Sequence, residues 1–211
     1  MVLIAEQSIL LVLEPASGVL TPVRAHIDPD VLAAAALLFD LAEQQRLRYE
    51  ADHVALKSSL PVSHPLLSQA LRVIGTPSHG LRVSAAIDLL ATRMAPLARE
   101  LLDGLVRRDH LHRVRRPAWW PWASIHYPIR SLQARNEAVA ALQGTVATAQ
   151  PSLRQLALLV LGEHAGQVAQ YVRGEAYDQA TRLLMELPLT RHEATPDRAL
   201  AAGIRHALAD F

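Results

Sequence analysis

The sequence predicts a mainly α-helical protein, folded as a single compact helical domain with small β-hairpins. Its 211 residues are a length typical of one domain, which we expect to span residues 1–211. Hydrophobic residues make up 51% of the chain but aromatic residues only 4%, so the apolar content is mostly Ala, Leu and Val. Ala and Leu are the best apolar helix formers, whereas strands favour β-branched and aromatic residues. This balance favours helices over a β-sandwich or barrel.

Capping residues and prolines mark the expected helices. Asp28, Pro29 and Asp30 offer an N-cap and a proline at the first helical position, and residues 31–41 are apolar almost all round, which predicts the most buried helix. Pro96 lies inside an apolar pattern of helical spacing and should kink or split that helix. The helices expected from spacing and caps cover residues 4–13, 28–45, 63–74, 81–108, 130–142, 152–161, 166–172, 175–187 and 196–209.

Short strands are expected at three places. Residues 46–49 and 53–56 alternate in polarity and can pair as a hairpin. A second hairpin is predicted around residues 117–121, where two prolines flank a tryptophan pair. Val19 and Leu20 follow a turn rich in Pro, Ser and Gly and are expected to form a short strand.

Charge and cysteine content exclude several classes of protein. The chain has 21 basic and 20 acidic residues, so a globally basic nucleic-acid binder is not indicated. It has no cysteine, which excludes disulfides, thiolate catalysis and cysteine-ligated metal sites. The N-terminus lacks the basic region of a signal peptide, and the longest strongly apolar run, residues 31–39, is far short of the roughly 20 residues of a membrane span. We therefore expect a cytoplasmic protein whose membrane contact, if present, is peripheral at the inner face of the membrane.

One segment concentrates positive charge beside every tryptophan of the chain. Residues 107–116 hold five Arg and one Asp, a charge of +4, so the rest of the chain totals −3. Arginine attracts anionic phosphate, and Trp prefers the headgroup depth of a bilayer. This pattern predicts an interfacial anchor in which the charge comes from Arg113, Arg115 and Arg116 and the inserted side chains are Trp119, Trp120 and Trp122.

Other interpretations of this segment remain open. The tryptophans can pack into the core beside the hairpin while the arginines form a solvated face, or the 107–122 segment can bind a protein partner. A helix followed by a basic hairpin also resembles a winged-helix unit, but the near-zero net charge and the lack of a clear recognition helix argue against nucleic acid.

The motifs of catalysis and metal binding are weak. His110 and His112 have a spacing that suits two ligands on a strand, but no third ligand clearly completes the set. No phosphate loop, dinucleotide-binding glycine pattern or nucleophile elbow occurs. We predict no catalytic residue, no metal and no cofactor.

Four segments in order resemble the Golgi phosphoprotein 3 family, and the likeness covers about residues 3–190. The first similar segment is the opening helix with its glycine turn. It is followed by a buried helix that runs into a short strand, a helix that begins with Pro-Leu-Leu, and a late Leu-rich helix. These segments are residues 3–13 with Gly18, residues 37–50, residues 64–71 and residues 156–161. The resemblance implies a mainly α-helical single domain and a peripheral membrane role, since eukaryotic members bind phosphatidylinositol 4-phosphate and the tails of glycosyltransferases.

The family's lipid-binding side chains do not transfer to this chain residue by residue. An ungapped placement of the family's Trp and three Arg puts them at Ala25, Ala34, Ala95 and Ala98, none of which can pair with a phosphate. Three arginines lie one or two residues from these positions and are expected to line a residual headgroup pocket. They are Arg24, Arg93 and Arg99.

The leading hypothesis is therefore a cytoplasmic, non-enzymatic, bacterial-type member of this family that docks reversibly on anionic membrane lipid. One alternative is a soluble protein-interaction adaptor, or an oligomeric scaffold that would assemble as a homo-oligomer. Another is an enzyme of an accessory pathway.

Overall fold

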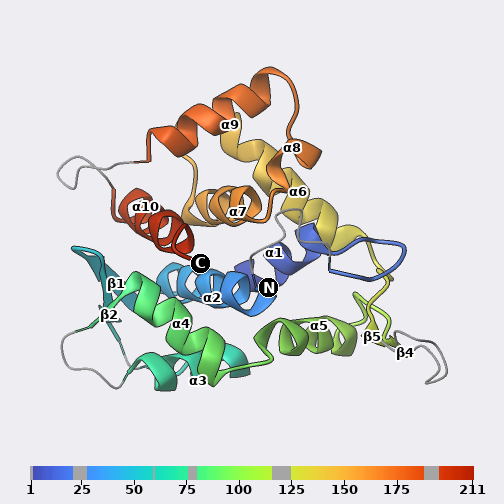
Figure 1. The fold of residues 1–211 in the computed structure, drawn as a ribbon, viewed down its shortest axis with the longest axis horizontal. Helices are drawn as coiled ribbons and strands as arrows, with labels where there is room; N and C mark the ends of the chain where they lie inside the picture. Colours follow the sequence, from blue (N-terminus) through green and yellow to red (C-terminus); the bar gives the residue numbers. More distant parts are fainter. Residues whose placement is uncertain (1, 21–27, 59, 76–79, 116–124, 188–194) are drawn as a thin grey trace.

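The computed structural model describes residues 2–20, 28–58, 60–75, 80–115, 125–187 and 195–211 (Figure 1). Within these ranges the chain forms helices joined by short strand pairs. The helices are α1 (Ile4–Val12), α2 (Pro29–Glu43), α3 (Pro65–Ile74), α4 (Val83–Arg93), α5 (Leu97–Arg107), α6 (Gln133–Val146), α7 (Leu153–His164), α8 (Val168–Tyr171), α9 (Glu175–Met185) and α10 (Pro196–Leu208). The strands are β1 (Leu47–Glu50), β2 (His53–Leu56), β3 (Leu81–Arg82), β4 (Val114–Arg115) and β5 (Ile125–His126).

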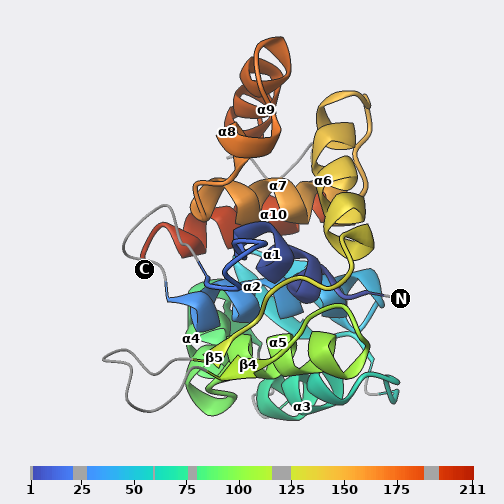
Figure 2. The same ribbon diagram turned by 90° about the vertical axis from the view of Figure 1, so that its right-hand side faces the viewer.

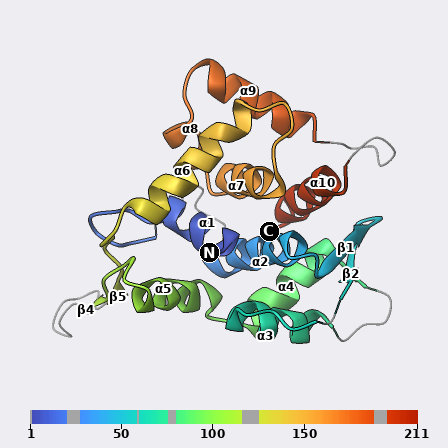
Figure 3. The same cartoon turned by 180° about the vertical axis from the view of Figure 1, so that it is seen from behind.

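The helices stack in layers about α1 and α2, which confirms the mainly α-helical class. Helices α3, α4 and α5 cover one side of this central pair, and α7 and α10 cover the other (Figures 1 and 2). Helix α6 packs on α1 and α7 and carries α8 and α9 outward from the body (Figure 2). The hairpins β1–β2 and β4–β5 lie at opposite ends of the molecule (Figures 1 and 3).

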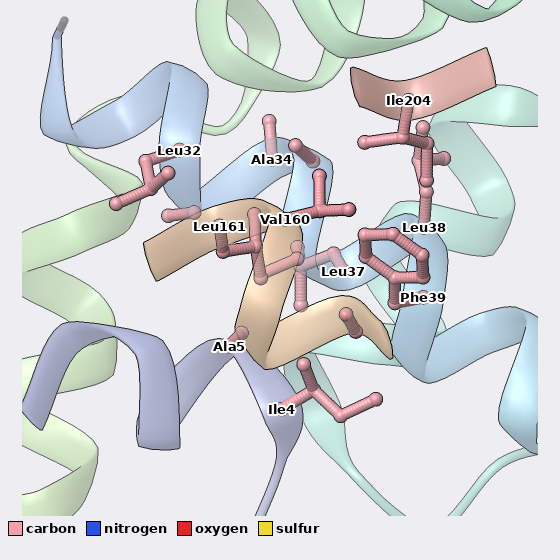
Figure 4. Close-up of a cluster of buried hydrophobic side chains, with 14 of the residues drawn as sticks. Ile4, Ala5, Leu32, Ala34, Leu37, Leu38, Phe39, Val160, Leu161 and Ile204 are labelled. Atoms are coloured by element: carbon pink, nitrogen blue, oxygen red, sulfur yellow. The ribbon is translucent and has the colours of Figure 1, made fainter. Parts of the chain in front are cut away.

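Helix α2 lies in the centre of the core, as its apolar sequence predicts. Every residue from Val31 to Ala42 is buried. Side chains of α1, α7 and α10 converge on it, including Ile4, Val160 and Ile204 (Figure 4). The helix begins as expected, since the Asp28 side chain accepts the N–H of Asp30 at 2.8 Å and proline occupies the first helical position.

A carboxylate from α2 caps the N-terminus of α1. The two oxygens of Asp40 accept the N–H groups of Ile4 and Ala5 at 2.8 and 3.0 Å. Asp40 is only 1% exposed, and this burial raises the pKa of its carboxyl to about 7, although the two N–H groups and the nearby Arg154 oppose the rise. Arg154 of α7 completes the contact by pairing with Glu43 at 2.6 Å. These bonds fix α1 in the centre of the fold.

One helix boundary differs from the expected one because of long-range pairing, and one expected strand is shorter. Leu81 and Arg82, expected to begin a helix, pair with β2 as a third antiparallel strand, and the helix starts at Val83. Pro96 separates α4 from α5, which confirms the expected kink or split of the 81–108 helix. The expected strand at Val19 and Leu20 is reduced to an isolated bridge between Leu20 and Leu13.

The ends of the C-terminal helices also shift. Helix α6 starts and ends later than expected, at residues 133–146, and α7 continues to His164. A capping box between Ser152 and Gln155 fixes the start of α7. The expected helix over 166–172 shortens to the single turn of α8.

The predicted second hairpin is present, because β4 and β5 pair antiparallel with Val114 opposite His126. Its expected tip, residues 117–121, lies outside the described ranges. The turn at Gly18 packs directly on the end of this hairpin, and the Tyr127 N–H donates to the Gly18 carbonyl at 2.9 Å. Gly18 has φ of 66°, and a Cβ there would lie 2.2 Å from the backbone nitrogen of Pro128. Only glycine allows this approach.

Candidate functional site

The C-terminal end of α5 meets the β4–β5 hairpin at the end of the molecule opposite β1–β2 (Figures 1 and 3), and several arginines belong to α5, to this hairpin and to the residues beside it. We call this surface the basic edge. It consists of Arg99, Arg107, Arg108, Arg113, Arg115 and Arg130, all of them exposed. It includes three of the arginines that the sequence predicts as anion-binding, Arg99, Arg113 and Arg115.

Asp103 of α5 lies between two of these predicted arginines. Its Oδ2 is 4.0 Å from Nε of Arg99, one helical turn earlier, and its Oδ1 is 3.8 Å from Nη1 of Arg113. The hydroxyl of the buried Tyr127 donates to the same Oδ1 at 3.1 Å. The structure thus brings together Arg99, expected in a residual headgroup pocket, and Arg113, expected in the basic segment.

Burial and the Asp103 carboxylate together raise the pKa of Tyr127, because both disfavour the phenolate. Tyr127 therefore remains a hydrogen-bond donor to Asp103 at neutral pH. This bond ties the residue after β5 to α5, which fixes the hairpin against the helix.

A second carboxylate binds Arg108 from the core side. Glu6 of α1 is 1% exposed, yet it forms an ion pair with Arg108 and accepts the Leu3 N–H at 3.0 Å. His64 Nε2 lies 3.8 Å from the same carboxylate. Burial lowers the pKa of His64, and Arg108 and Arg107 lower it further while Glu6 opposes them, so His64 is largely neutral at pH 7. Because Arg108 pairs with the buried Glu6, its charge stabilises the fold and is not available to a ligand.

The remaining arginines differ in how their charge is compensated. Arg130 pairs with Asp109 at 2.5 Å. For Arg107 and Arg115, the described part of the chain places no carboxylate within 4.0 Å of the guanidinium. Val114, between Arg113 and Arg115, is 46% exposed. The basic edge therefore presents uncompensated positive charge beside an exposed apolar side chain.

Other predicted residues are not part of this cluster. Arg93 is exposed in the last turn of α4, and no contact among the described residues joins it to the Asp103 cluster. The remaining predicted residues lie outside the described ranges. They are Arg24, Arg116, Trp119, Trp120 and Trp122.

The positions aligned with the family's lipid-binding side chains form no anion site among the described residues. Ala34 is fully buried inside α2. The N–H of Ala98, at the start of α5, donates to Oδ1 of Asp30 at 2.7 Å, so an internal carboxylate already occupies this helix N-terminus. A phosphate placed there would meet Asp30, and an anion-binding pocket at this position is not supported. Ala25 lies outside the described ranges.

Sequence reasoning missed three residues that organise the basic edge. Asp103 could have been found, because it lies four residues after Arg99 on a predicted helix, a spacing typical of ion pairs. Tyr127 and Glu6 reach the edge only through tertiary contacts, 24 and 102 residues from their partners.

The fold and the site together define a mainly α-helical protein with one basic edge and, among the described helices, none long and apolar enough to cross a membrane. Within the same residues, no group of three His, Asp or Glu side chains is arranged to hold a metal ion.

The chain belongs to the Golgi phosphoprotein 3 (GPP34) family, whose model matches residues 4–210. This match confirms the resemblance drawn from the ordered segments. A comparison with curated proteins found no match.

Proposed function

We propose that this protein is a non-enzymatic, cytoplasmic member of its family that docks reversibly on anionic membranes through the basic edge. The observation that carries the proposal is the basic edge itself, where Arg107 and Arg115 have no carboxylate within 4.0 Å among the described residues and Val114 is exposed. Family membership supports a peripheral membrane role, and the edge supplies the chemistry for it.

The available charge is sufficient for weak, reversible attachment. Arg107 and Arg115 contribute one charge each, and the pair of Arg99 and Arg113 keeps one more after compensation by Asp103. Each basic residue near an acidic leaflet is worth on the order of 1 kcal/mol. Three such charges correspond to about 3 kcal/mol, or roughly a hundredfold preference for anionic over neutral bilayers at low salt.

The attachment we propose depends on charge rather than on a deep headgroup pocket. Asp30 occupies the N-terminus of α5 next to Ala98, where the ungapped placement puts one of the family's lipid-binding arginines. The Trp side chains predicted for membrane insertion lie between β4 and β5 in the sequence, outside the described ranges, and their insertion stays a sequence-based prediction. They are Trp119, Trp120 and Trp122.

Vesicle flotation tests the proposal. The protein is mixed with phosphatidylcholine vesicles containing 0 or about 30% phosphatidylglycerol, at low salt and at several higher salt concentrations. We expect binding only to the anionic vesicles, with a loss of binding as salt screens the surface charge.

Equal flotation with neutral and anionic vesicles, or no flotation with either at low salt, would contradict the proposal. In the second case, chemical cross-linking and light scattering would decide whether the protein instead acts as a soluble adaptor or a homo-oligomeric scaffold.

A further inference from the structure

The guanidinium groups of Arg99 and Arg113 both lie near Asp103, but neither donates a hydrogen bond to it. Both lie 3.8–4.0 Å from the Asp103 carboxylate, beyond direct hydrogen-bond distance, and their side chains are 50% and 46% exposed. No hydrogen bond among the described residues uses a side-chain N–H of either guanidinium. The donors of both forks therefore remain available to a ligand that approaches from solvent.

The fold fixes the relative position of these two guanidiniums. Arg99 lies on the first turn of α5, and Arg113 immediately precedes β4. Asp103 contacts both and is itself anchored by the hydroxyl of the buried Tyr127. One anchored carboxylate therefore keeps both guanidiniums within about 4 Å of the same group, which limits how far apart they can move before a ligand binds.

The charge of this cluster is +1, from two guanidiniums and one carboxylate. A phosphodiester carries one negative charge and can accept paired N–H bonds from arginine. A phosphomonoester carries about −1.5 to −2 and would bring its additional charge close to Asp103. The cluster is thus complementary to a singly charged phosphate.

We propose that Arg99 and Arg113 together form a receptor for one lipid phosphodiester headgroup, and that Asp103 sets its selectivity against phosphomonoesters. This inference rests on the proposed membrane docking. A lipid is favoured over a free phosphate because Arg113 directly precedes the exposed Val114, and Arg115 adds a further uncompensated charge on the same short strand.

The substitution Asp103→Asn tests the role of this carboxylate. The amide oxygen of Asn still accepts the Tyr127 hydroxyl, while the cluster charge rises from +1 to +2. We expect binding to phosphatidylglycerol vesicles to increase about fivefold. The control Asp88→Asn removes the same charge from an exposed site on α4 and should change binding less than about twofold.

Headgroup selectivity is measured on phosphatidylglycerol and phosphatidic acid vesicles matched in zeta potential. The wild type should prefer the diester, and Asp103→Asn should lose that preference. A folded Asp103→Asn protein that binds as weakly as the wild type, or more weakly, would show that Asp103 only tethers the hairpin. A wild type that binds both lipids equally would also overturn the inference.

Arginine variants keep the inference testable if Asp103→Asn does not fold. Arg99→Gln and Arg113→Gln should each weaken phosphatidylglycerol binding about fivefold, whereas Arg48→Gln, on β1 at the opposite end, should have little effect. Because both arginines hold one headgroup, the double variant should lose less than about tenfold. A loss of about 25-fold, the product of two independent charges, would contradict a shared receptor.

These outcomes separate the two proposals. If the wild type does not bind phosphatidylglycerol vesicles at all, membrane docking fails. If the wild type binds but the Asp103, Arg99 and Arg113 variants do not behave as stated, docking stands and the receptor does not.

Discussion

Neutralising Asp40 should make the protein more stable at neutral and alkaline pH, although it weakens a helix cap. Asp40 is buried and accepts the N–H groups of Ile4 and Ala5. Burial raises the pKa of its carboxyl from an ordinary 3.8 to about 7. Between these two pH values the folded state holds a proton that the unfolded state has released, so stability falls as the pH rises through this window.

The size of the effect follows from the two pKa values. A difference of about three units corresponds to about 4 kcal/mol of stability lost between pH 3.8 and 7. The substitution Asp40→Asn removes this loss, since asparagine does not ionise. Its amide oxygen can accept only one of the two N–H groups, which costs about 1 kcal/mol. The variant should therefore exceed the wild type by about 3 kcal/mol at pH 8.

Urea unfolding followed by circular dichroism at pH 5, 6, 7 and 8 measures this difference. Other groups that titrate in this range, including His64, are common to both proteins and largely cancel. The advantage of Asp40→Asn should grow by about 2–3 kcal/mol from pH 5 to pH 8 and level off above pH 7. If the variant is less stable than the wild type by the same amount at every pH, the ionised carboxylate is an effective cap and the reasoning is wrong.

Further variants test the packing of the fold and the predicted membrane contact. Gly203→Ala should destabilise the protein by more than about 2 kcal/mol, because its Cβ would lie 2.5 Å from the Tyr49 hydroxyl oxygen, whereas Gly104→Ala meets nothing closer than 3.6 Å and should stabilise α5 by about 0.5–1 kcal/mol. Both are measured by urea unfolding, and the same sign for the two would contradict the packing described. Arg108→Gln leaves Glu6 buried without its cation and should cost about 1–3 kcal/mol, a smaller loss than for a fully buried pair because Arg108 is partly exposed. Replacing the three tryptophans with alanine should reduce flotation on anionic vesicles while leaving the far-ultraviolet circular dichroism spectrum unchanged; loss of the folded spectrum would instead favour their packing in the core. These tryptophans are Trp119, Trp120 and Trp122.

Local sequence signals predicted most of the helices because they act within one turn. The N-cap Asp28 and Pro29 define the start of α2, and Pro96 separates α4 from α5. The strand at Leu81 and Arg82 was not predictable in this way, because it depends on β2, more than 25 residues earlier in the chain. Local periodicity continues through these two residues, and tertiary pairing overrides it.

Part of the candidate site was predictable from charge alone. The concentration of arginine in residues 107–116 identified the surface, but not how the fold distributes its charge. Arg108 belongs to the same basic run as Arg113, yet it pairs with the buried Glu6 of α1, 102 residues away. Arg99 appeared in the sequence as part of a separate pocket, and only the fold places it beside Asp103 with Arg113.

The central claim, docking through the basic edge, is tested most directly by the partition of matched double variants on phosphatidylglycerol vesicles at low salt. Arg107→Gln with Arg115→Gln removes the two charges that the described fold leaves uncompensated. Arg48→Gln with Arg173→Gln removes two exposed charges from β1 and from the segment before α9. We predict that the first pair lowers the partition coefficient by roughly 30-fold and the second by less than about twofold. Equal losses for the two pairs would contradict docking through this edge.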